Sequence, residues 1–128
     1  MVERSGIEPE KVFATLLSFE HDQSGDTRAA AINGLGLLGT ENTITPLLEI
    51  MRWDKSFDLR ERAACNLADS GMLTRELRQK AVPELIRFAQ DETLDATTRK
   101  WVFQALREIA QKNLPDDANE WVRSLRLE

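Results

Sequence analysis

Apolar residues along the chain return at intervals of three and four positions, which is the period of an α-helix. Four such stripes stand out: Ala31/Leu35/Leu38, Ile44/Leu48/Met51, Ala81/Leu85/Phe88 and Val102/Leu106/Ile109. Short polar segments separate the stripes and supply the side chains that cap and stop helices. The pattern predicts an all-α chain of about seven antiparallel helices, at roughly 9–21, 26–39, 43–53, 57–70, 74–90, 95–112 and 116–126.

A two-helix repeat underlies these stripes. An aspartate ends one helix of each unit, and an arginine follows it six to eight residues later: Asp22 and Arg28, Asp54 and Arg60, Asp91 and Arg99. A five-residue insertion near 73–77 lengthens the second interval between the aspartates. We expect the acids to cap the next helix or to pair with these arginines, and so to fix the angle between repeats. A regular two-helix period is typical of an α-solenoid.

Several segments carry the signature of a known repeat. The sequences DTRAAAINGLGLLG at 26–39, PLL at 46–48 and DLRERAACNLA at 58–68 resemble HEAT repeats. They are most similar to the short bacterial kind that also occurs in phycobilisome-lyase-type proteins. In the third unit, Trp101 and Phe103 replace small residues of the motif. The resemblance covers roughly residues 12–112 and implies a right-handed superhelix, with the helices that carry Pro46 and Pro83 on the concave side.

The repeat pattern organises the whole chain as one domain, residues 1–128, with helical units at roughly 9–22, 26–54, 57–91 and 95–126. The first helix lacks a mate in this scheme, which favours a fragment of a longer array or an N-terminal cap. Leu127-Glu128 resembles the remnant of a removed tag. Uncapped ends would allow self-association through exposed apolar rims.

Composition narrows the function classes. The chain holds 22 acids and 17 bases, for a net charge of −5, and the first 58 residues carry all of that excess. An acidic surface repels phosphate backbones, so a nucleic-acid partner is not expected. No apolar run is long enough to span a membrane, and a single cysteine favours a reducing, cytoplasmic setting.

The candidates for chemistry have simpler explanations. The segment from Gly34 to Gly39 matches G-x-G-x-x-G, but it lies inside a predicted helix, where a dinucleotide site would need a preceding strand. Its glycines are better explained by close helix contact and a helix stop. His21 and Cys65 are the only histidine and cysteine, too few for a metal site of three or four such ligands. We therefore expect no catalytic residues, no metal and no cofactor.

One face of the predicted array varies between repeats while the core positions do not. Trp53 aligns with His21 and Gln90, which are polar, so this position should face solvent. The sequence predicts a partner-binding concave face made of Trp53, Leu47, Ile50, Glu84, Arg87, Gln90 and His21. For Leu47 and Ile50 the alternative is packing between adjacent helices.

The predicted function is a non-catalytic module for protein–protein interaction or scaffolding, with another protein as the partner. Two alternatives stay open: a subunit or domain of a bilin-lyase-type protein, implied by the resemblance, and a nucleic-acid-binding HEAT-like module. Incubation with bilin and an apo-phycobiliprotein would test the first. A salt titration against duplex DNA would test the second, since such binding weakens steeply with salt.

Overall fold

The structure is a computed structural model that describes residues 9–125. All regular elements in this range are helices: α1 (Pro9–Phe19), α2 (Gly25–Leu38), the 3-10 turn η2 (Glu41–Thr43), α3 (Ile44–Trp53), α4 (Phe57–Ala68), α5 (Arg75–Gln79), α6 (Val82–Gln90), α7 (Ala96–Ala110) and α8 (Ala118–Leu125). The all-α prediction is confirmed. Leu127-Glu128 lie outside the described residues.

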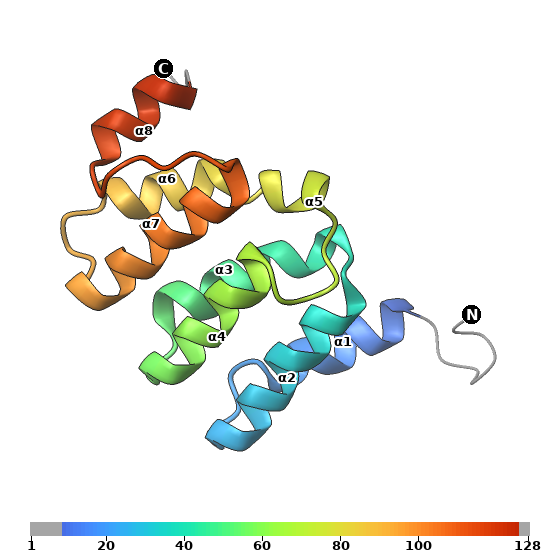
Figure 1. Cartoon of the computed structure of the whole chain (residues 1–128). Helices are drawn as coiled ribbons and strands as arrows, with labels where there is room; N and C mark the ends of the chain where they lie inside the picture. The colour runs from blue at the N-terminus through green and yellow to red at the C-terminus, as the bar shows by residue number, and fades with distance from the viewer. Residues whose placement is uncertain (1–8, 126–128) are drawn as a thin grey trace.

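The helices form two layers (Figure 1). Helices α2, α4 and α7 make the front layer in this view, and α1, α3 and α6 make the back layer behind them. Consecutive members α1–α2, α3–α4 and α6–α7 pack as antiparallel hairpins, and α8 packs against α6 at the C-terminal end of the stack. No helix within residues 9–125 has the length and apolar character needed to cross a membrane.

Local side-chain chemistry sets where the helices begin and end. Ser24, Ser56, Thr74 and Asp95 accept hydrogen bonds from the third following backbone N–H at the starts of α2, α4, α5 and α7. Gly39 ends α2 in the left-handed region, with φ of 62°, and its N–H bonds to Leu35 O. The stop predicted at Gly39 is therefore confirmed.

The single helix predicted at 74–90 is wrong. The structure has two helices there, α5 and α6, with a turn at Lys80 and Ala81 between them. Pro83 lies in the first turn of α6. Proline has no N–H to donate and its ring clashes with the carbonyl four residues earlier, so one helix cannot run through this point.

The core is continuous and follows the predicted stripes. Leu48 and Leu85 are buried in register, and Leu16 is half-buried at the same repeat position in α1. Phe19 departs from its counterpart Met51, because its side chain is 42% exposed at the N-terminal edge of the stack. At the other end, the fully buried Trp121 of α8 packs into the core, and its Nε1–H donates to Pro115 O at 3.0 Å.

Candidate binding groove

A groove runs between α3 and α6 on the back layer. Its volume is about 440 Å³, and both apolar and charged side chains line it: Ile44, Thr45, Leu48, Glu49, Trp53, Lys80, Pro83, Glu84, Arg87 and Phe88. We call it the α3–α6 groove. Its floor includes core side chains of both helices, and its charged residues lie on their exposed sides.

Trp53 is the largest exposed apolar side chain at this groove. It is the last residue of α3, and 68% of its surface is accessible. The guanidinium of Arg52 lies 4.0 Å from the centre of its ring. This cation–π contact holds one face of the indole in place. The exposure predicted for Trp53 is thus present in the structure.

Most charges around the groove are already paired. Arg87 binds Glu84 at 2.5 Å, and Lys80 binds Glu41 at 3.2 Å. Glu49 differs, because it takes part in no ion pair with any residue between 9 and 125. The groove therefore presents an aromatic ring, apolar side chains and one carboxylate that lacks a basic partner.

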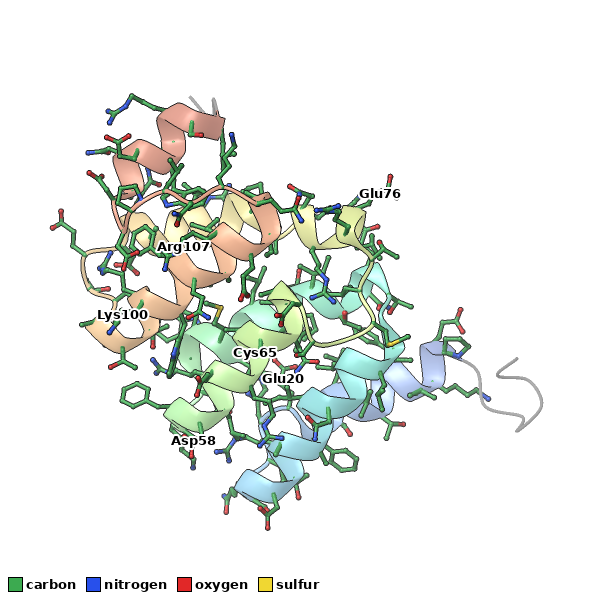
Figure 2. All side chains as sticks on the ribbon, viewed as in Figure 1. Glu20, Asp58, Cys65, Glu76, Lys100 and Arg107 are labelled. Carbon is green, nitrogen blue, oxygen red and sulfur yellow. The ribbon has the colours of Figure 1, made fainter. Side chains whose placement is uncertain are left out.

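A second carboxyl group, that of Glu20, is buried inside the stack. Glu20 follows α1, and Figure 2 shows it at the junction between the first and second hairpins. Its side chain is 5% exposed, and its Oε2 is enclosed without a hydrogen-bond partner among the described residues. Burial, reinforced by the nearby Glu49 carboxyl and opposed by His21, raises the pKa of Glu20 to about 7. Sequence reasoning missed Glu20, since an acid at the end of a surface helix carries no sign of burial.

The structure brings together only part of the predicted partner-binding face. Trp53, Glu84 and Arg87 all line the α3–α6 groove. Gln90 ends α6 and His21 follows α1, and both are exposed but do not line this groove.

The prediction that Leu47 and Ile50 belong to the partner-binding face is wrong. Leu47 is 0% exposed and Ile50 is 3% exposed, and both belong to the core. Their positions on α3 face the packed side of the helix, where variation between repeats reflects different packing neighbours. The alternative of packing between helices is the one the structure supports.

The repeat aspartates share one local geometry. In Asp22, Asp54 and Asp91, Oδ1 accepts the backbone N–H two residues later, at 2.8–2.9 Å. This Asx turn leads into the next helix. Hydrogen bonds from Thr93 and Arg52 lower the pKa of Asp91 to about 2.

The repeat arginines do make contacts with the repeat aspartates, but through different atoms than the predicted ion pairs. Arg28 and Arg60 donate to the backbone carbonyls of Asp22 and Asp54, their own frame partners, instead of to the carboxylates. Two carboxylates pair instead with an arginine of the preceding hairpin: Asp54 with Arg28 at 2.9 Å, and Asp95, which is not one of the three repeat aspartates, with Arg60 at 3.0 Å.

The third unit follows the same plan. Arg99 donates to the carbonyls of Ala89 and Asp91, and the carboxylate of Asp91 binds Arg52 of the preceding unit at 2.9 Å. The set forms a ladder of ion pairs along one edge of the stack. Each arginine thereby fixes a helix end within its own unit, and those that pair across also set the angle to the next.

Arg78 is a structural residue that sequence reasoning missed. It is 8% exposed and reaches from α5 to the C-terminal end of α4, where it donates to the carbonyls of Asn66, Leu67, Gly71 and Leu73 at 2.9–3.1 Å. These carbonyls have no intrahelical partners, and the negative end of the helix dipole favours a cation there. The contact holds the inserted segment on the stack.

The two candidates for chemistry lie on different elements, and no hydrogen bond joins them. Cys65 is exposed on α4, while His21 follows α1. Burial and the carboxylates of Glu61, Asp69 and Glu108 raise the pKa of the Cys65 thiol, which is the opposite of nucleophile activation. Within residues 9–125, no group of three or more His, Cys, Asp or Glu side chains could hold a metal ion.

The glycines of the G-x-G-x-x-G segment serve helix packing. A Cβ on Gly34 would lie 2.6 Å from Leu16 of α1, and one on Gly36 would lie 2.0 Å from Asn66 of α4. These contacts confirm that the glycines permit close helix approach.

Comparison with known proteins agrees with the two-helix geometry. The family model described as the PBS lyase HEAT-like repeat matches residues 27–52, which correspond to α2 and α3. Residues 27–52 are thus similar to a HEAT-like repeat, and the helical architecture is consistent with one. No curated protein and no solved structure shows significant similarity to it. The HEAT-like match covers the second helix of the first hairpin and the first helix of the second, and the hairpin α6–α7 stacks on them in the same two layers.

Proposed function

We propose that this HEAT-like protein is a non-catalytic module that binds another protein through the α3–α6 groove. The observation that carries the proposal is Trp53, a tryptophan that is 68% exposed beside a groove of about 440 Å³. Tryptophan and arginine supply much of the affinity in protein interfaces, and an exposed indole beside a groove offers such an anchor. Trp53 and Arg87 line the same groove and would act as its anchors.

The groove suits an extended or helical segment of a partner better than a small substrate. It lies open along two neighbouring helices, and its paired charges, Glu84–Arg87 and Lys80–Glu41, form a polar rim around apolar side chains. A rim of this kind around an apolar centre is the usual anatomy of a protein interface.

A capture experiment with matched variants tests the groove. The tagged protein and its Trp53→Ala/Arg87→Ala variant are used as baits, and the proteins retained by each are compared quantitatively. We expect the double variant to lose at least tenfold of the specifically captured protein, with an unchanged circular dichroism spectrum.

A front-layer substitution is the control. Leu37 is 75% exposed on α2, beside a separate cavity of about 670 Å³ between α2 and α4. Leu37→Ala removes exposed apolar surface as well but should leave capture intact. Equal capture by the double variant and the unmodified protein would reject the α3–α6 groove, and loss with Leu37→Ala alone would assign binding to the front layer.

A bilin-lyase-type role is the second candidate, favoured by the description of the matching family model. Incubation with bilin and an apo-phycobiliprotein would reveal a covalent or accelerated attachment. The raised pKa of Cys65 argues against that thiol as a nucleophile, so we rank this role below protein binding.

A further inference from the structure

Trp53 presents a fixed aromatic surface in the α3–α6 groove. The guanidinium of Arg52 lies 4.0 Å from the centre of its ring, and the same guanidinium binds the carboxylate of Asp91 at 2.9 Å. One face of the indole is therefore covered by a cation that is itself anchored to the next unit. The Trp53 side chain is still 68% exposed, so the rest of the ring is available to a partner.

The ring favours an apolar side chain over a cation. A ring that already carries a guanidinium on one face gains less from a second cation, because like charges on its two faces repel each other. The groove also contains the side chains of Leu48, Pro83 and Phe88. A partner would thus find aromatic and apolar surface beside Trp53.

The indole N–H of Trp53 indicates the backbone conformation of the occupant. It donates no hydrogen bond to any residue between 9 and 125, whereas the indole N–H of Trp121 donates to Pro115 O. The carbonyls of an α-helix are bonded within the helix, but those of a polyproline II segment are free to accept. The groove is open and holds only about 440 Å³, so a stiff segment that loses little conformational entropy suits it better than a flexible one.

Glu49 indicates the charge of the occupant. Its carboxylate lines the groove and forms no ion pair within residues 9–125, while the neighbouring glutamates at the groove are paired. The groove therefore offers this carboxylate to a basic side chain. The four residues from Glu49 to Trp53 span about 6 Å along α3, which is also about the rise of two residues in a polyproline II segment.

We propose that the α3–α6 groove binds a proline-rich segment in the polyproline II conformation, with a basic residue two positions from the proline that packs on Trp53. The inference rests on the proposed function and specifies the partner's chemistry. Proline rings are apolar and stiff, and grooves lined by aromatic side chains bind such segments in several kinds of peptide-binding domain. The indole N–H would donate to a carbonyl of the segment, and the basic side chain would bind Glu49.

Isothermal titration calorimetry with defined peptides tests the proposal. The probe is an acetylated and amidated octapeptide, PPRPPRPP, in which each arginine lies two positions from a proline in both directions. One control replaces both arginines by citrulline, their neutral isostere, and the other replaces every proline by alanine. We expect the probe to bind about threefold more tightly than the citrulline peptide and about fivefold or more tightly than the alanine peptide.

Variants of the protein assign these preferences to side chains. Trp53→Ala should weaken binding of the probe at least tenfold. Glu49→Gln should abolish the preference for arginine over citrulline and leave the affinity for the citrulline peptide unchanged. Glu76→Gln is the matched control, because it removes one negative charge on α5, away from the α3–α6 groove (Figure 2), and should leave the preference intact.

Several outcomes would overturn the proposal. An equal loss of the arginine preference with Glu76→Gln would show nonspecific attraction to an acidic protein. Equal affinity for the proline and alanine peptides would reject the polyproline II segment, as would no binding of the probe or unchanged binding with Trp53→Ala. Circular dichroism and melting curves verify that each variant is folded.

This inference and the proposed function fail separately. If capture from a lysate depends on Trp53 and Arg87 but the probe binds no better than its alanine control, the groove stands and the proline-rich segment is wrong. If the probe depends on Trp53 and Glu49 while capture is unchanged in the double variant, the proline-rich site stands and the captured protein binds elsewhere.

Discussion

At the scale of single residues, the most consequential side chains are polar groups that the fold encloses. Arg78, Glu20 and Asp54 are at most 9% exposed. Arg78 donates hydrogen bonds to backbone carbonyls, and Asp54 accepts one from Arg28. The Oε2 of Glu20 has no hydrogen-bond partner within residues 9–125. Arg78 and Asp54 stabilise the stack, and Glu20 makes stability depend on pH.

Arg78→Ala should lower the free energy of unfolding by about 2–4 kcal/mol, because the carbonyls at the end of α4 lose their charged donor. Urea denaturation followed by circular dichroism measures the change. Arg75→Ala, at an exposed position of the same short helix, should change stability by less than about 0.5 kcal/mol. Similar losses for the two variants would contradict the role given to Arg78.

Glu20 makes stability depend on pH with a definite sign. Its pKa is about 7 in the fold, against an ordinary value of 4.5, so the folded state holds its proton more tightly than the unfolded chain. The contribution is fully present below pH 4.5 and is lost as the pH rises towards 7.

As the pH rises from 4.5 to 7, we expect the free energy of unfolding of the unmodified protein to fall relative to that of Glu20→Gln. Urea denaturation at a series of pH values measures the difference, with Glu76→Gln as a variant that should retain the unmodified protein's slope. A wild-type slope in Glu20→Gln would show that another group is responsible.

At the scale of elements, close approach between layers and units depends on missing side chains. Helix α2 meets the turn after α4 at Gly36, whose carbonyl accepts the Met72 N–H at 2.8 Å. Asn66, anchored by its amide to Arg62 O, fills the space where a Cβ at position 36 would lie. The inserted segment after α4 therefore rests directly on the backbone of α2.

Gly36→Ala should destabilise the protein by about 1–3 kcal/mol, even though alanine is the better helix former. The new Cβ would displace the Asn66 amide, which is packed and hydrogen-bonded. Thermal melting measures the loss. Gly36→Ala combined with Asn66→Ala should recover part of it, and no recovery would show that the clash lies elsewhere.

At the scale of the whole molecule, the ladder of aspartates and arginines fixes the relation between successive units. The buried Arg28–Asp54 pair joins the first unit to the second, and the more exposed Arg60–Asp95 and Arg52–Asp91 pairs join the second to the third. Since a solenoid propagates the angle of each junction, these few contacts set the course of the α3–α6 groove.

Asp54→Asn should cost about 3–5 kcal/mol, because it leaves the Arg28 charge buried without its partner. A double-mutant cycle with Arg28→Met, followed by urea denaturation, should show strong coupling between the two positions. The exposed Glu120–Arg123 pair is the comparison and should give less than about 1 kcal/mol. A coupling energy below about 1 kcal/mol between Arg28 and Asp54 would contradict the role of these ion pairs in fixing the junctions between hairpins.

The sequence predicted the buried core positions better than the residues that line the groove. The stripe Val102/Leu106/Ile109 is buried as its spacing requires, and Trp53 is exposed as its polar counterparts indicate. Leu47 and Ile50 were misplaced because variation between repeats occurs both at solvent-facing positions and where packing neighbours change. Glu20 and Arg78 were missed because their burial comes from contacts with other helices.

By itself, the sequence determined what is local and periodic in this protein: the helical class, the repeat frame, the caps and the acidic balance of the first half. These follow from hydrogen bonding and side-chain spacing within a few residues of each position. Only the tertiary structure decided which acceptors each repeat arginine binds, that Arg78 holds the inserted segment on the stack, and that Glu20 is buried. Such contacts join distant parts of the chain, and their free energies depend on burial that exists only once the layers have stacked.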